Sequence, residues 1–132
     1  MSELFVPVTA IYVGINAIIL MALGAMVTAR RAKLKIDCGD GGNEILIKAI
    51  RAHGNAAEYI PTALILLVVL ELLVAPLWLL HALGIALTVG RLAHAQGMYQ
   101  SLGVSPGRFV GATLTWLVLL VGGFPCLYIV LI

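Results

Sequence analysis

The stretch that decides the fold is Arg51-Ala-His-Gly-Asn55-Ala-Ala-Glu58-Tyr-Ile-Pro61, which leads directly into an apolar run over residues 60–74. Arg51, Asn55 and Glu58 stand at positions i, i+4 and i+7. On a helix these positions fall within about 60° of one another, so the three side chains share one face. Charged and amide side chains at the mouth of a membrane helix are costly to keep, and the default interpretation of such residues is a functional site.

The composition of the chain supports a membrane protein. Of its 132 residues, 62% are hydrophobic and 11% are charged, whereas a soluble domain has about 25% charged residues. The mean hydropathy is +1.11. A chain of this length cannot bury so much apolar surface in a core of its own, because small domains keep much of their surface exposed. We therefore expect a lipid bilayer to cover the rest, and the net charge of +2 gives no argument for a nucleic-acid partner.

Four apolar stretches approach the length of a membrane span, at about residues 5–29, 55–74, 77–99 and 109–132. Each is close to the roughly 20 residues that cross a hydrocarbon core of about 30 Å. Helices satisfy all of their backbone polar groups in lipid, and the long continuous runs do not resemble the short alternating strands of a membrane barrel. The prediction is an all-α fold, a four-helix bundle that forms one integral membrane domain over residues 1–132.

Basic residues are distributed unevenly among the connections. Six of the eight lie between the first and second spans, Arg108 lies between the third and fourth, and Arg91 lies within the third, toward its second end. The N-terminus, the turn at 75–76 and the C-terminus have none. By the positive-inside rule, both basic connections face the cytoplasm and both termini lie outside. We predict a multi-pass protein of the bacterial inner membrane, with polar groups from several helices gathered on the cytoplasmic side.

Each of these residues also has an ordinary structural interpretation. Arg108 and Arg30 fit interfacial anchors whose long side chains reach the headgroups. Short acidic and amide side chains do this poorly, so Glu58 needs another explanation, and one is an ion pair with Arg91 or Arg51 that holds the bundle together.

Four residues outside this cluster are interpreted structurally. Glu71 and His81 lie toward the opposite membrane face, where we expect anchors or packing partners. Cys38 and Cys126 fall on opposite sides of the predicted membrane, so a disulfide within one chain is not expected, and no metal site is expected because neither has a suitably spaced second ligand.

Together, the stretch Arg51–Pro61 and the later Gly90-Arg-Leu-Ala-His94 resemble the MAPEG family, the membrane-associated proteins in eicosanoid and glutathione metabolism. That family includes microsomal glutathione transferases and prostaglandin E synthase. The chain is most similar to the small bacterial branch, in which Gly-Asp-Gly-Gly precedes the second helix, as Gly39-Asp-Gly-Gly42 does here. The resemblance extends from the first span to the start of the fourth.

The resemblance implies a homotrimer of four-helix protomers, with glutathione bound as cosubstrate in clefts between neighbours near the cytoplasmic face. Matched residue by residue, it implies a thiol-polarising arginine at Arg108 and glutathione contacts at Arg51, Asn55, Glu58, Arg91, His94, Tyr99 and one of Arg30 and Arg31. The match at Tyr99 requires one residue inserted after His94.

Two positions depart from the prostaglandin synthase branch. Phe109 replaces a serine hydroxyl implicated in the chemistry of that branch, and Gly54 replaces a further basic residue. Prostaglandin synthase activity is therefore not expected.

The chemistry of glutathione suits these residues. Arginine forks bind carboxylates, a glutamate accepts from an ammonium, and an asparagine both donates and accepts. A thiol titrates near ~8.5 and its thiolate is the nucleophile, so a guanidinium such as Arg108 favours the reactive form. We expect a glutathione-dependent transferase or peroxidase that acts on lipophilic electrophiles or lipid hydroperoxides.

Two other classes stay open. One is a non-catalytic glutathione- or lipid-binding membrane protein. The other, less favoured, is a small transporter subunit, since the polar groups cluster on one side instead of crossing the bilayer.

Overall fold

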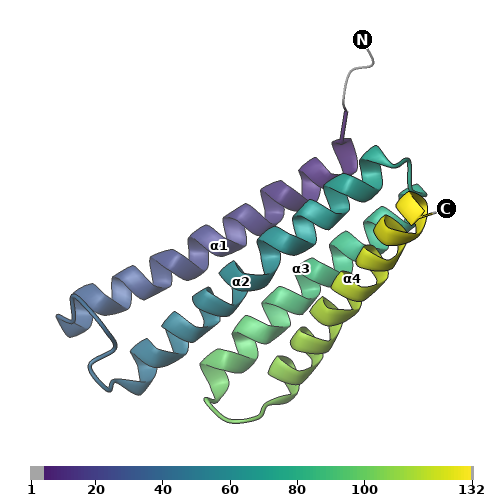
Figure 1. Cartoon of the computed structure of the whole chain (residues 1–132). Coiled ribbons are helices and arrows are strands. Elements are labelled where there is room, and N and C mark those ends of the chain that lie inside the picture. The colour runs from purple at the N-terminus through teal and green to yellow at the C-terminus, as the bar shows by residue number, and fades with distance from the viewer. Residues whose placement is uncertain (1–4, 132) are drawn as a thin grey trace.

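The computed structural model describes residues 5–131, which fold into four long helices joined by short connections. They are α1 (Pro7–Leu34), α2 (Glu44–Leu72), α3 (Leu77–Gln100) and α4 (Pro106–Leu131). Successive helices run in opposite directions (Figure 1). Each is long and apolar enough to cross a membrane. The predicted all-α membrane bundle is therefore confirmed.

The second helix begins well before the apolar span that was predicted near residue 55. Its N-cap is Asn43, whose side-chain oxygen accepts the N–H groups of Ile45 and Leu46 at 3.1 and 3.2 Å. Such a cap satisfies two of the four donors that a helix start leaves free. The resulting helix of 29 residues is about 43 Å long, more than a bilayer core requires. Arg51 and Asn55 therefore lie inside a continuous helix, on a backbone that holds their relative positions.

The loop between α1 and α2 is shaped by residues with left-handed backbones. Lys35 ends α1 with φ of 55°, and its N–H donates to Ala32. Gly39, Gly41 and Gly42 follow with φ between 58° and 68°, a region that costs glycine little. The sequence Gly39-Asp-Gly-Gly42 thus forms a tight reversal that returns the chain to the start of α2.

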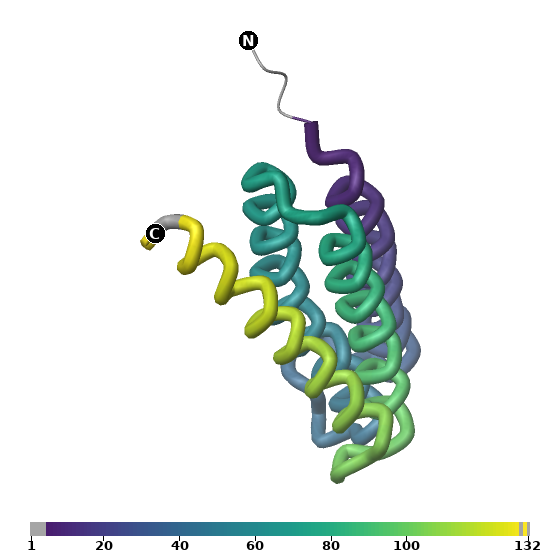
Figure 2. The backbone as a smooth tube through the Cα atoms, turned by 90° about the vertical axis from the view of Figure 1, so that its right-hand side faces the viewer, coloured from purple at the N-terminus to yellow at the C-terminus, as the bar shows by residue number. Residues whose placement is uncertain are grey.

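Helices α3 and α4 approach each other closely through glycines. A Cβ atom on Gly111 would collide with the carbonyl of Gly90 and with the backbone of His94, and one on Gly97 would collide with the backbone of Arg108. Small residues permit such contact between membrane helices. This contact places the second half of α3 against the first turns of α4. Figure 2 shows α4 inclined to the other helices. Helices α3 and α4 therefore spread apart beyond this contact, toward the C-terminus of α4.

Polar side chains at the turn end of the bundle, where residues 73–76 join α2 to α3, are paired with one another. The carboxylate of Glu71 accepts the N–H groups of Val8 and Thr9 at 2.9 and 2.7 Å. The N-cap residue of α1, Val6, makes no side-chain hydrogen bond to the helix start. Glu71 caps α1 instead, and a carboxylate at this position also stabilises the helix N-terminus by its charge. One turn further, the hydroxyl of Tyr12 lies 2.9 Å from Nδ1 of His81. Glu71 and His81 are packing partners, as predicted.

Candidate functional site

The predicted site residues come from all four helices and lie in the half of the bundle nearest connections 35–43 and 101–105. We call this half the basic end; it is the lower part of the bundle in Figure 1. The residues are Arg30 on α1, Arg51, Asn55 and Glu58 on α2, Arg91, His94 and Tyr99 on α3, and Arg108 on α4.

A hollow of about 120 Å³ opens on α2, and we call it the α2 hollow. Three of its lining residues are Arg51, Asn55 and Glu58, which the sequence placed on one helix face. The full lining is Ile50, Arg51, Gly54, Asn55 and Glu58.

The two charges of the α2 hollow are exposed and have no ion-pair partner among the residues that the structure describes. Arg51 and Glu58 both face outward. Within residues 5–131, the one ion pair joins Lys48 to Glu44 at 2.7 Å. The pairing of Glu58 with Arg51 or Arg91, considered above as a structural explanation, is therefore not seen. Seven residues separate the two charges, or about 10 Å along the helix.

Arg91 is the central buried residue of the basic end. Its side chain is only 1% exposed. Nη1 donates to Oδ1 of Asn55 at 2.7 Å, and Nη2 donates to the carbonyl of Gly111 at 3.1 Å. The guanidinium carbon also lies 5.4 Å from the centre of the Tyr59 ring, a cation–π distance. One side chain thereby joins α2, α3 and α4.

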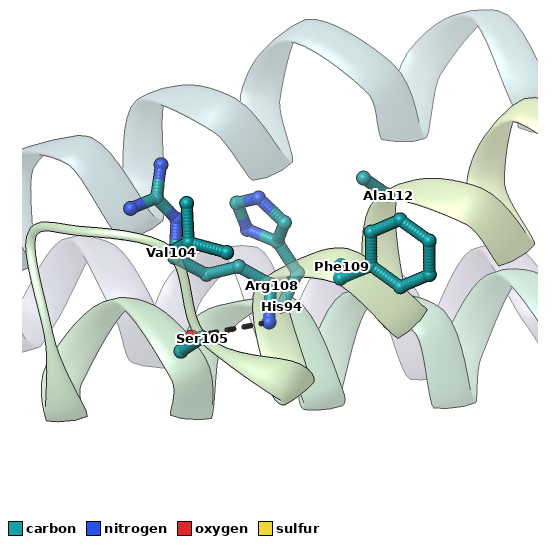
Figure 3. Close-up of a pocket in the computed structure, with 6 residues that line it drawn as sticks. All are labelled: His94, Val104, Ser105, Arg108, Phe109 and Ala112. Atoms are coloured by element: carbon teal, nitrogen blue, oxygen red, sulfur yellow. Dashed lines mark hydrogen bonds between the residues drawn. The ribbon is translucent and has the colours of Figure 1, made fainter.

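A second hollow, of about 200 Å³, lies at the start of α4, and we call it the α4 hollow. It is lined by His94, Val104, Ser105, Arg108, Phe109 and Ala112. In the view of Figure 3, the imidazole of His94 lies between the guanidinium of Arg108 and the ring of Phe109. A cation, an imidazole and an apolar ring therefore border the same space.

Local hydrogen bonds fix the geometry of this hollow. Ser105 accepts the N–H of Arg108 at 3.4 Å, and its hydroxyl donates to the carbonyl of Gly97 at 3.2 Å. The Arg108 guanidinium donates to the carbonyls of Leu102, at 2.6 Å, and Gly103. These contacts hold Arg108 beside the hollow. Both guanidinium bonds come from Nη1, so the other N–H donors of the guanidinium have no partner in the described chain.

The two neighbouring arginines at the end of α1 make different contacts. Arg31 donates to three carbonyls of the following loop, those of Ile36, Asp37 and Gly39, the last at 2.7 Å. Arg30 instead lies over the ring of Tyr99, with its guanidinium carbon 5.0 Å from the ring centre.

Arg30 also borders a third hollow, of about 300 Å³, which we call the α1 hollow. Its lining residues come from α1 and the start of α2 and are Arg30, Lys33, Leu34 and Ile45. Of the two arginines that the sequence left open, Arg30 is the one that faces free space.

The structure brings some of the predicted residues together and keeps others apart. Asn55 touches Arg91, His94 borders the same hollow as Arg108, and Arg30 stacks on Tyr99. The three hollows share no lining residue. Within one protomer, the predicted ligands therefore form three neighbouring groups instead of a single pocket.

Tyr59 belongs to this region and was missed by the sequence reasoning. Its ring lies against Arg91, and its hydroxyl accepts from Nε1 of Trp116 on α4 at 3.3 Å. A signal for it exists in the sequence: Tyr59 stands four residues after Asn55, on the same face of α2.

Comparison with known proteins agrees with this architecture. Residues 9–128 match the model of the MAPEG family. In two strains of Escherichia coli, a protein named inner membrane protein YecN is 40% identical over 113 residues, which cover 86% of this chain and 85% of the relative. No solved structure gives a significant match. With four helices long and apolar enough to cross a membrane and a family match over most of its length, the chain is a membrane protein that belongs to the MAPEG family.

Proposed function

We propose that this protein is a glutathione-dependent membrane transferase or peroxidase that acts on lipophilic electrophiles or lipid hydroperoxides. The observation that carries the proposal is the α2 hollow of a MAPEG chain, in which Arg51 and Glu58 flank Asn55 and have no ion-pair partner within residues 5–131. An exposed cation and anion about 10 Å apart on one helix complement a ligand that carries both charges. Glutathione is such a ligand, with two carboxylates and an ammonium.

Each side chain of the α2 hollow has a chemical role toward this ligand. The fork of Arg51 forms charge-assisted, bidentate bonds with a carboxylate. The carboxylate of Glu58 accepts from the ammonium. Binding at these charges orients the tripeptide, and orientation is itself a large part of catalysis in group transfer.

Activation of the thiol is assigned to the α4 hollow. A guanidinium near the sulfur stabilises the thiolate, and each unit of thiol pKa corresponds to about 1.4 kcal/mol. Arg108 supplies this charge. Phe109, whose side chain is 69% exposed, supplies an apolar wall for a substrate that arrives from lipid.

The two proposed reactions share the first nucleophile. In transfer, the thiolate attacks an electrophilic carbon, a C–S bond forms, and the leaving group departs with the electron pair. In peroxide reduction, the thiolate attacks the O–O bond, and the products are an alcohol, after proton uptake, and a sulfenic acid. A second glutathione then converts the sulfenic acid to a disulfide and water.

The assembly and its placement are also part of the proposal. Three hollows without a common residue suit a homotrimer in which a neighbouring protomer completes each site. The relatives are named inner membrane proteins, and we assign this protein to the inner membrane, with the basic end toward the cytoplasm and both termini outside.

One observation favours a second candidate, a protein that binds glutathione without turnover. Arg108 already donates to two loop carbonyls. If those contacts persist with ligand bound, the guanidinium is drawn away from the sulfur and the thiol stays inactive.

The test is calorimetric titration of glutathione into detergent-purified protein, with Arg51→Ala and Glu58→Ala beside it. Lys48→Ala and Glu44→Ala are matched controls, because they remove the same charges from the same helix where those charges pair with each other. We expect binding in the micromolar-to-millimolar range that the first two changes weaken about tenfold and the controls leave unchanged. Folded protein that does not bind glutathione excludes the proposal.

Turnover with chlorodinitrobenzene and with cumene hydroperoxide then separates the two candidates. Conjugation or peroxide reduction above the uncatalysed rate supports the enzyme. Binding without either reaction supports the second candidate.

A further inference from the structure

The contact between Arg91 and Asn55 fixes the orientation of an amide. A guanidinium carries only donors, so the Asn55 atom that faces it must be the carbonyl oxygen. That oxygen lies 2.7 Å from Nη1 of Arg91. The amide NH₂ group therefore points away from Arg91, and Asn55 lines the α2 hollow.

We infer that Arg91 is a positioning residue, which holds Asn55 so that the α2 hollow is offered an N–H donor and never the amide oxygen. The inference rests on the proposed function, and it narrows the expectation that Asn55 both donates and accepts. It also changes the expected role of Arg91, from a direct glutathione contact to a residue that acts through Asn55.

Burial is the first argument that Arg91 does not contact the ligand itself. Its side chain is 1% exposed, whereas Asn55 is half-buried and Arg51 is exposed. Arg91 is also absent from the lining of the α2 hollow. A ligand in that hollow meets Asn55 before it can meet Arg91.

The second argument is that the guanidinium is held in place from several sides. Its other arm donates to the Gly111 carbonyl, which also accepts the hydroxyl of Thr115 at 2.9 Å. The ring of Tyr59 lies over it. An arginine held on α4 and against an aromatic ring keeps a constant position, and the amide that accepts from it is held equally.

The orientation assigns the polarity of the ligand in the hollow. Arg51 and Asn55 stand one turn apart and both present donors, so a carboxylate or carbonyl oxygen fits between them. Glu58, less than one turn further along, presents an acceptor. The hollow thus selects a group with a carboxylate toward Arg51 and an ammonium toward Glu58, the arrangement of an α-amino acid end.

The sharpest variant is Asn55→Asp, which keeps the oxygen facing Arg91 and replaces the outward NH₂ by a second oxygen. We expect glutathione affinity to fall about tenfold or more, because a donor becomes a negatively charged acceptor. Thermal stability should be at least that of Asn55→Ala, since aspartate keeps a partner for the buried guanidinium. Unchanged glutathione affinity in Asn55→Asp would overturn the inference.

A double-mutant cycle separates a positioning role from direct contact. If Arg91 acts through Asn55, Arg91→Met with Asn55→Ala binds glutathione within about twofold of Asn55→Ala alone. If Arg91 touches the ligand, the two losses multiply. Should Arg91→Met fail to fold, Arg91→Lys is measured alone, because lysine retains the charge and a donor for Asn55 but lacks the bidentate fork. A positioning role then predicts glutathione affinity close to that of the wild type, whereas a direct bidentate contact with the ligand predicts a loss of affinity.

Failure of the proposed function is distinguishable from failure of this inference. If the wild-type protein does not bind glutathione, the function is wrong, and the unfolding temperatures still test the contact. Lower stability in Asn55→Asp than in Asn55→Ala would show that Asn55 offers no oxygen to Arg91. Wild-type binding with multiplying losses in the cycle would leave the function intact and refute the positioning role.

Discussion

The two ends of the bundle differ in where their polar side chains find partners. At the turn end, Glu71 caps α1, and Tyr12 contacts His81. At the basic end, Arg51 and Glu58 project outward and have no ion-pair partner among the described residues. Both ends hold residues that are costly in a membrane helix. The difference shows that polarity alone does not mark a site, and the proposed glutathione site rests on charges that lack an ion-pair partner among the described residues.

Arg91 shares features of both ends: its side chain has hydrogen-bond partners inside the bundle, but its charge has no ion-pair partner among the described residues. It is buried as deeply as a core residue, but its partners in the described chain are the neutral oxygens of Asn55 and Gly111 and the ring of Tyr59. A buried charge without a carboxylate is expensive. The basic end is therefore built around a buried positive charge that has no carboxylate partner among residues 5–131.

The largest expected effect is on turnover, at the basic end. In Arg108→Ala, the proposed thiolate loses its stabilising charge, and we expect the rate of conjugation at saturating glutathione to fall about 100-fold. Glutathione binding should change less, because Arg51 and Glu58 stay in place. The measurement is a steady-state assay with a chromogenic electrophile, and an unchanged rate would remove Arg108 from the mechanism.

A smaller effect is expected at the turn end. Tyr12→Phe removes one hydroxyl that contacts His81 and leaves the packing of the ring against Gly84 intact. The lost hydrogen bond should lower the free energy of unfolding by about 1 kcal/mol, seen as a lower thermal midpoint in detergent. Glutathione affinity should be the same as in the wild type, and a change would mean that the two ends are coupled.

Adjacent arginines give a third comparison within the basic end. Arg31 is engaged with loop carbonyls, whereas Arg30 borders the α1 hollow. Arg30→Ala should weaken glutathione binding several-fold, by loss of an exposed charge–charge contact. Arg31→Ala should leave binding unchanged and increase protease cleavage in the loop 35–43. The opposite pattern of affinities would assign the ligand contact to Arg31.

Much of the fold follows from simple patterns in the sequence. The number and order of the helices came from four apolar runs, which are read reliably because lipid leaves few alternatives. The predicted span began near residue 55 because it followed the apolar run, and the helix itself extends back from that span to its cap at Asn43. Lengths of apolar runs define the membrane-embedded part of a helix and not its polar extension.

The site was less accessible from sequence. Periodicity placed Arg51, Asn55 and Glu58 on one face of α2, but it gives no information on which neighbouring helix that face meets. The contact of Asn55 with Arg91 joins α2 to α3, and the other arm of the same guanidinium reaches α4 at Gly111, where α3 and α4 lie close together. Such long-range contacts are set by tertiary packing, and a single sequence does not encode them in any local pattern.

The most direct test of the whole account compares Glu58→Gln with Glu71→Gln, the same substitution on the same helix. Glutathione affinity and thermal stability are measured on both variants and on the wild type. The account predicts that Glu58→Gln weakens binding about tenfold at unchanged stability, and that Glu71→Gln lowers stability by about 1–3 kcal/mol at unchanged affinity. If Glu58→Gln destabilises the bundle and leaves affinity unchanged, Glu58 is a structural residue and the assignment of the α2 hollow as the glutathione site is wrong.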